Sequence, residues 1–212
     1  MCWRLPPVSR SVEHGGTAQL TPPPADINRR ALDIALVSPT SLCRVSRHST
    51  GEPHFGRTGS CRFDDPQPNI RKRFGTCYLG FNLTIAFAES VLHDLEPDAN
   101  GFSVPSSEVT CRFALSFKAV KKGAKLRLAK MYGTALLRLG GNGELSGTPD
   151  YTLPQAWAAA LVAHPERIDG FLYMSRRIND ALAVVLFERI SRSACPSLGT
   201  SRFRLFIIAT SC

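Results

Sequence analysis

Short apolar runs of strand type are the feature of this sequence that most constrains its fold. "TCRFALSF" alternates apolar and polar residues with the period of a strand, and "TCYLGF" and "ALAVVLFE" are rich in β-forming residues. Loops rich in Pro, Gly and Ser separate several of these runs. The expected strands are residues 32–37, 42–46, 76–81, 110–117, 124–130, 170–175 and 181–188.

One helix is expected directly after the strand at 76–81. Asn82 or Thr84 can cap its start. Four apolar residues then follow at the spacing i, i+3, i+4, i+7, which places them on one helical face. They are Ala88, Val91, Leu92 and Leu95. Glu89 lies beside this apolar face.

A second helix is expected over 153–164. Thr152 and Gln155 have the spacing of a capping box, and Pro165 would end the helix. Strands and helices thus mix without a regular β-α-β rhythm. This pattern predicts a compact α+β fold with flanking helices, not a doubly wound parallel sheet.

The length of 212 residues favours one domain. Residues 1–25 are rich in Pro, Gly, Ser and Thr and are expected to form a disordered tail. The domain is expected to cover 26–190. The segment 191–212 is atypical and contains a further apolar run, "FRLFIIAT", which could form a last strand.

Composition limits the location of the chain. Apolar residues make up 43% and charged residues 20% of the sequence, as in soluble globular proteins. No run approaches the roughly 18 apolar residues of a membrane span, and the first residues have no apolar signal-peptide core. We therefore expect a cytoplasmic protein without a membrane partner.

The cysteines and histidines do not predict a metal site. The seven cysteines lie far apart, and neither a CxxC pair nor a His/Cys cluster with zinc-ligand spacing occurs. His48 and His54 share a loop but lack a matching set of carboxylates. We expect reduced thiols and no metal.

The net charge of +9 indicates anionic partners, which include nucleic acid, a phosphorylated small molecule or an acidic protein. The basic clusters are short and are not interleaved with aromatic residues, so no direct nucleic-acid contact is expected. "GGNGELSG" lacks the third glycine of a dinucleotide fingerprint, and neither a Walker A sequence nor a GxSxG elbow is present.

Three blocks of the sequence follow one another in a specific order: "RFDDP…FGTCYLGFNLTIAFAE", "DYTLPQAWAAALVAHPERIDGFLYMSR" and "LAVVLFER". Together they resemble the RES domain, the toxin half of bacterial Xre–RES toxin–antitoxin pairs. The resemblance runs from "PPADINRRALDIALV" to Arg189. It implies a fold similar to that of ADP-ribosyltransferases, activity on NAD+ and an Xre-type antitoxin as partner.

The resemblance also implies a set of site residues. By motif, the family's arginine, tyrosine, glutamate and serine correspond to Arg62, Tyr78, Glu89 and Ser175, and Arg44 corresponds to a further arginine in an early strand. Two positions depart from the family pattern. Cys61 replaces the usual glycine before the arginine, and Cys43 replaces an aromatic residue.

These residue types suit cleavage of the bond between nicotinamide and ribose. A carboxylate such as Glu89 can stabilise a ribosyl cation or hold a ribose hydroxyl. Arg62 and Arg44 offer guanidinium groups for the pyrophosphate, Tyr78 a ring for nicotinamide, and Ser175 a hydroxyl donor. From the residues alone, structural roles are the more usual ones: a surface ion pair for each arginine, a half-buried strand aromatic for Tyr78 and a non-catalytic serine at a strand end for Ser175.

Further candidate site residues, the acceptor of the ribosyl group and the activity itself also remain open. Tyr173, His48 and His54 are second-tier site residues. The acceptor of the ribosyl group could be water, phosphate, or a protein or nucleotide. The alternatives are therefore an NAD+ glycohydrolase or phosphorylase that depletes NAD+ and arrests growth, a mono-ADP-ribosyltransferase that modifies a protein, and a catalytically inactive basic binding protein.

Overall fold

The computed structural model describes residues 19–93, 95–119, 122–188 and 198–202. These residues form one eight-stranded sheet in the order β1-β5-β6-β7-β3-β2-β4-β8. β5 and β6 run parallel, and the other neighbouring pairs are antiparallel. The strands are β1 (Ile34–Val37), β2 (Cys43–Ser46), β3 (Gly75–Gly80), β4 (Phe113–Ala119), β5 (Leu126–Lys130), β6 (Gly170–Met174), β7 (Leu182–Glu188) and β8 (Leu198–Arg202).

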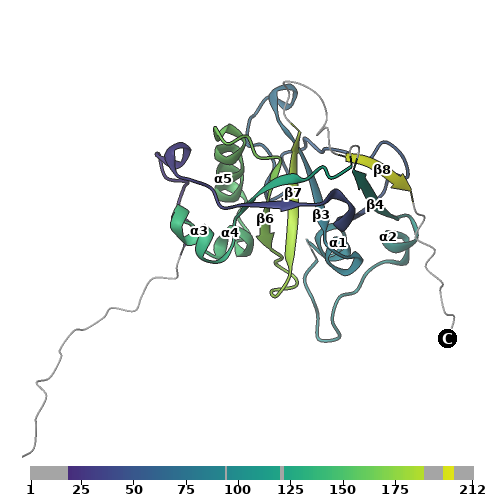
Figure 1. Cartoon of the computed structure of the whole chain (residues 1–212). Helices are drawn as coiled ribbons and strands as arrows, with labels where there is room; N and C mark the ends of the chain where they lie inside the picture. Colours follow the sequence, from purple (N-terminus) through teal and green to yellow (C-terminus); the bar gives the residue numbers. More distant parts are fainter. Residues whose placement is uncertain (1–18, 94, 120–121, 189–197, 203–212) are drawn as a thin grey trace, which may run out of the picture.

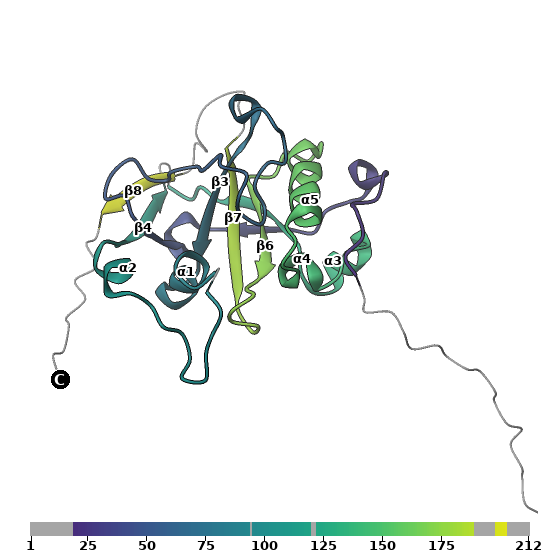
Figure 2. The ribbon, with the colours of Figure 1, turned by 180° about the vertical axis from the view of Figure 1, so that it is seen from behind.

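Helices flank this sheet in two groups. Figures 1 and 2 show α3, α4 and α5 gathered beside β6, whereas α1 and α2 lie near β3 and β4. The helices are α1 (Leu83–Ser90), α2 (Ser106–Thr110), α3 (Gly133–Leu139), α4 (Glu144–Gly147) and α5 (Thr152–Ala163). The predicted α+β class with mixed β-sheet and flanking helices is confirmed, and the described strands form a single sheet.

The sheet curls so that part of one face packs on itself. Leu126 and Leu128 of β5 share a buried cluster with Phe117 of β4, although four strands separate β5 from β4 in the sheet. A flat sheet would hold these side chains far apart, since neighbouring strands lie about 4.8 Å apart. The central strands are therefore buried on both faces.

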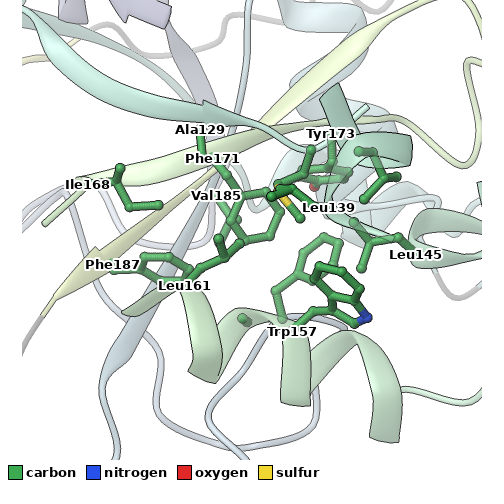
Figure 3. Close-up of a cluster of buried hydrophobic side chains, with 14 of the residues drawn as sticks. Ala129, Leu139, Leu145, Trp157, Leu161, Ile168, Phe171, Tyr173, Val185 and Phe187 are labelled. Carbon is green, nitrogen blue, oxygen red and sulfur yellow. The ribbon is translucent and has the colours of Figure 1, made fainter. Parts of the chain in front are cut away.

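The other face of the sheet carries the larger core, which α5 covers. Figure 3 shows Trp157 and Leu161 of α5 beside Phe171 of β6 and Val185 of β7. The Trp157 indole N–H donates to the Thr21 carbonyl oxygen at 2.9 Å, and Leu20 is buried in the same cluster. The folded part thus begins before residue 26, the expected boundary. Residues 1–18 of the expected tail lie outside the described residues.

The helix expected after β3 is shorter than predicted. α1 ends at Ser90, so Leu92 and Leu95 are not helical. After the end of α1, the Arg177 guanidinium donates to the carbonyl oxygens of Leu92 and Leu95 and so holds the segment that follows the helix. The apolar spacing persists because the chain still packs on the core, where Val91 is buried.

Two further predictions fail at element ends. The capping box is wrong, because Thr152 makes no side-chain cap bond and the Gln155 side chain donates to the loop before Arg62. The strand expected from residue 110 begins at Phe113, because α2 occupies the preceding residues and leaves Cys111 exposed.

The structure describes only part of the segment 191–212, in which a last strand was expected. β8 lies within the segment 191–212, but "FRLFIIAT" follows it, outside the described residues. No helix in the described ranges is long and apolar enough to cross a membrane.

Candidate active site

A cavity of about 380 Å³ opens where the end of β2, the Arg62 loop, α1 and the end of β6 meet. Its lining is strongly basic. The lining arginines are Arg44, Arg47, Arg62, Arg112, Arg176 and Arg177. Among the described residues that line it, Glu89 is the sole carboxylate. The cavity therefore combines an excess of positive charge with one fixed negative group.

Glu89 is held by a hydroxyl group at each carboxylate oxygen. The Tyr173 hydroxyl donates to Oε2 at 2.7 Å, and the Ser175 hydroxyl donates to Oε1 at 2.6 Å. Hydrogen bonds to an ionised acceptor are short and stronger than neutral ones. These two bonds fix the orientation of the carboxylate relative to the cavity.

The close packing of α1 on β3 places Glu89. An added Cβ at Gly80 would lie 2.5 Å from the backbone nitrogen of Ala86, so only glycine allows this approach. The Asn82 side chain then accepts the Ile85 N–H at 2.9 Å and caps the helix, as one of the two predicted caps. Glu89 follows one turn after Ile85.

Ser175 lies behind Glu89, not in the cavity wall. It is 2% exposed and does not line the cavity. Its hydroxyl also accepts the Ile178 N–H at 3.2 Å, which leaves its proton directed at Glu89. In this arrangement the Glu89 carboxylate lies between Ser175 and the cavity.

Tyr173 joins the core to the cavity. Its ring packs edge-to-face on Phe63, with 4.8 Å between ring centroids. Burial, followed by the charge of Glu89 and the hydrogen bond to it, raises the pKa of Tyr173 well above its usual value. The phenol is therefore a stable proton donor to Glu89 at neutral pH.

Arg62 is placed by its neighbour in the sequence. Phe63 is 0% exposed and anchors the loop in the core, while Arg62 turns into the cavity. The guanidinium donates to the Thr148 carbonyl oxygen at 2.5 Å and lies 4.6 Å from the centroid of the Tyr151 ring. Its pKa is lowered, mainly by burial, and the charge of Arg176 lowers it further.

Tyr78 contributes its ring to the cavity, but its hydroxyl is engaged within the protein. The hydroxyl oxygen accepts the Phe63 N–H at 2.9 Å and lies 3.5 Å from an Asp64 carboxylate oxygen. Burial and the Asp64 charge raise the pKa of Tyr78 well above its usual value. Tyr78 therefore offers a ligand a half-buried aromatic surface.

Arg44 is committed to an internal ion pair. Its guanidinium donates to Glu52 Oε2 at 2.7 Å, to the His54 carbonyl oxygen at 2.7 Å and to Cys77 Sγ at 2.9 Å. Glu52 is buried, so its carboxylate neutralises much of the Arg44 charge. Arg44 thereby shapes the loop that brings His48 and His54 to the cavity wall.

The other lining arginines also have carboxylate partners. Arg47 and Arg112 both pair with Glu108, and Arg176 and Arg177 both lie within ion-pair distance of Glu96. In the part of the chain that the structure describes, Arg62 is the lining arginine without a carboxylate at ion-pair distance. Its charge is therefore the most available to an anionic ligand.

The structure thus gathers most of the sequence-predicted residues. Glu89, Arg62, Tyr78 and Arg44 line the cavity, as do the second-tier residues Tyr173, His48 and His54, whereas Ser175 lies behind Glu89. Sequence reasoning missed Tyr151, which lies in the second of the three family-like blocks but was not singled out as a site residue. In the described residues no cluster of three or more His, Cys, Asp or Glu could hold a metal ion.

The cysteine before Arg62 does not strain the loop. The positive φ in this loop, +79°, belongs to Gly59, two residues before Cys61. Cys61 itself is not in the left-handed region, so a side chain is tolerated there. The Cys43 thiol lies 3.6 Å from the Gly80 carbonyl oxygen, beside the start of α1.

Comparison with known proteins gives a family and a fold. A family model described as the RES domain matches residues 41–204. The crystal structure of the MbcT–MbcA toxin–antitoxin complex of M. tuberculosis is similar over 84% of this chain and 90% of that chain. The TM-score is 0.54 and the sequence identity is 12%, so this likeness concerns the fold. No curated protein matches the sequence.

Proposed function

This chain belongs to the RES domain family, and we propose that it binds NAD+ and cleaves the bond between nicotinamide and ribose. The observation that carries the proposal is the Glu89 carboxylate, which the hydroxyls of Tyr173 and Ser175 fix in an arginine-lined cavity. One oriented carboxylate in a basic cavity suits a ligand that is anionic in one part and becomes cationic in another.

The basic lining supports recognition of the pyrophosphate. A guanidinium forms paired hydrogen bonds with phosphate oxygens, and Arg62 has the least committed charge of the lining arginines. The cavity volume of about 380 Å³ lies in the range of small-molecule sites. The Tyr78 and Tyr151 rings offer surfaces on which a flat heterocycle can pack.

Glu89 supports the bond cleavage itself. When the bond from ribose C1′ to the nicotinamide nitrogen breaks, nicotinamide leaves with the electron pair and becomes neutral. The positive charge moves to the ribose, where a carboxylate stabilises the oxocarbenium-like transition state. An acceptor oxygen then bonds to C1′ and loses its proton. Water, phosphate or a protein side chain can each supply this acceptor oxygen.

The biological setting we propose is that of a toxin. The similar fold in the MbcT–MbcA toxin–antitoxin complex supports this setting. We propose that NAD+ loss arrests growth, that an Xre-type antitoxin is the protein partner, and that contacts with DNA belong to that partner. Transfer of ADP-ribose to a protein is the alternative activity at the same site.

The test is incubation of the purified chain with NAD+ and chromatography of the products. The proposal predicts free nicotinamide from the wild type and a strong decrease for Arg62→Ala. Parallel reactions with and without phosphate, and with candidate acceptor proteins, distinguish ADP-ribose, its phosphorylated product and a modified protein. Absence of nicotinamide from folded protein that binds NAD+ would refute the proposal.

A further inference from the structure

We propose that Asp64 is a positioning residue, which holds the loop before Arg62 and thereby sets the place of the Arg62 guanidinium in the cavity. This inference rests on the proposed function, because it assigns Asp64 a part in the same site. Asp64 itself does not line the cavity. It would act on the substrate only through the neighbouring residues that do.

The Asp64 carboxylate is buried and surrounded by donors. The residue is 2% exposed. Its Oδ2 accepts the backbone N–H groups of Gly59 and Cys61, at 3.0 and 3.1 Å, and the Thr58 hydroxyl at 3.1 Å. Its Oδ1 accepts the Thr76 hydroxyl at 2.5 Å. The loop from 58 to 61 therefore wraps around one carboxylate oxygen, and β3 contacts the other.

This carboxylate is not held by a cation. In the described ranges, no Lys, Arg or His side chain lies within ion-pair distance of Asp64. A buried charge is costly unless hydrogen bonds compensate it, and here neutral donors alone do so. An apolar residue would avoid this cost, so the arrangement favours a role in fixing the backbone that supplies the donors.

The opposite side of the same loop is fixed by α5. The Gln155 side-chain amide donates to the carbonyl oxygens of Gly59 and Cys61, both at 3.0 Å. Asp64 thus holds the N–H groups of Gly59 and Cys61, and Gln155 holds their carbonyl groups. Arg62 follows directly, so its Cα position depends on a backbone that is held on both sides.

The Asp64 carboxylate also lies near Tyr78, whose ring lines the cavity. The Tyr78 hydroxyl lies 3.5 Å from Asp64 Oδ1 and accepts the Phe63 N–H. Loss of the Asp64 carboxylate would therefore loosen the Arg62 loop together with the hydroxyl end of Tyr78. Misplacement of a positioned group by about 1 Å is enough to reduce a rate on the order of 100-fold.

The test is a double-mutant cycle on kcat/KM for nicotinamide release. We expect Asp64→Ala to lose on the order of 100-fold. Asp64→Asn should lose less, because its amide oxygen can still accept the Gly59 and Cys61 N–H groups. In the Arg62→Ala background, Asp64→Ala should have a much smaller effect than in the wild type, because most of its effect passes through Arg62. Additive losses, as expected of a merely structural residue, would overturn the proposal.

The neighbouring carboxylate provides a matched control. Asp65 accepts the Gln67 and Phe74 N–H groups, both at 2.8 Å, and does not line the cavity. Asp65→Asn should therefore leave kcat/KM close to the wild-type value. An equal loss in Asp65→Asn and Asp64→Asn would show that general loosening, and not the contact with the Arg62 loop, causes the effect.

A substrate-free measurement separates this inference from the proposed function. Amide hydrogen exchange at Gly59 and Cys61 should accelerate strongly in Asp64→Ala and less in Asp64→Asn, but not in Asp65→Asn. Unchanged exchange at both amides would overturn the positioning role, even if the enzyme is active. If exchange accelerates in the Asp64 variants but the wild type releases no nicotinamide, the proposed function is refuted, whereas the positioning role of Asp64 is supported.

Discussion

Tyr173→Phe is the change that tests most sharply how the Glu89 carboxylate is oriented. It removes the hydroxyl that donates to Glu89 Oε2 at 2.7 Å and keeps the ring that packs on Phe63. A hydrogen bond to a charged group contributes about 2 kcal/mol, and each 1.36 kcal/mol corresponds to about tenfold in rate. We therefore expect kcat/KM for nicotinamide release to fall roughly 30-fold.

The cost of this change to stability should be small. Glu89 lines the cavity, so water can replace the lost phenol as a donor. Ser175→Ala differs, because it also leaves the partly buried Ile178 N–H without its acceptor and should cost about 1 kcal/mol of unfolding free energy. The two variants should thus have similar losses of activity but different losses of stability.

The assay is nicotinamide release at several NAD+ concentrations, together with urea denaturation of each variant. Tyr132→Phe is the matched control, because Tyr132 does not line this cavity. It should leave the rate unchanged. A wild-type rate in Tyr173→Phe, with a strong loss in Glu89→Gln, would refute the idea that the phenol orients the carboxylate.

Three other changes test the structure around the site. Gly80→Ala should reduce both stability and nicotinamide release, measured by thermal unfolding and chromatography, because its Cβ would lie 2.5 Å from the Ala86 nitrogen and displace α1. Glu52→Ala should cost about 3–5 kcal/mol in urea denaturation, since it leaves the Arg44 charge without its buried partner. Burial raises the pKa of Cys77 from 9.0 to about 11. The protonated Cys77 thiol therefore contributes fully to stability below about pH 9, and this contribution is lost as the pH rises towards about 11. In the wild type the unfolding free energy should fall across this window. Cys77→Ala removes the titrating group, so the fall should become smaller by up to about 1.4 kcal/mol per pH unit.

The strands could be predicted because their pattern is local. β7 was expected at 181–188 and lies at Leu182–Glu188, and its alternate residues enter the two cores on opposite faces of the sheet. The order of the strands could not be predicted in this way. β2 pairs with β4 as well as with β3, although the long segment from β3 through α2 separates β2 from β4 in sequence. Nothing local encodes such a pairing.

The end of α1 shows a similar limit. The spacing of Ala88, Val91 and Leu92 predicted continued helix, yet α1 ends at Ser90. The group that holds the following segment, Arg177, lies 85 residues away from Leu92 in sequence. Apolar spacing indicates which side chains face the core, but it does not reveal a distant side chain that takes the carbonyl groups.

The site was predictable as a set of residue types in order, but not as a geometry. Glu89 and Ser175 could be named as partners in one site, but the 2.6 Å bond that places Ser175 behind Glu89 spans 86 positions. Asp64 and Asp65 are adjacent in "RFDDP", and no periodicity distinguishes them. Their different partners, the Arg62 loop for Asp64 and the Phe74 N–H for Asp65, depend on the folded loop.

The most direct test of the central claim compares Glu89→Gln with the wild type in two measurements, NAD+ binding by calorimetry and nicotinamide release by chromatography. Glutamine keeps the size of the side chain and removes the charge that would stabilise the ribosyl cation. We predict that Glu89→Gln binds NAD+ with nearly wild-type affinity and releases nicotinamide at least about 100-fold more slowly. Equal release by the two proteins would contradict the assignment of Glu89 and, with it, the proposed mechanism.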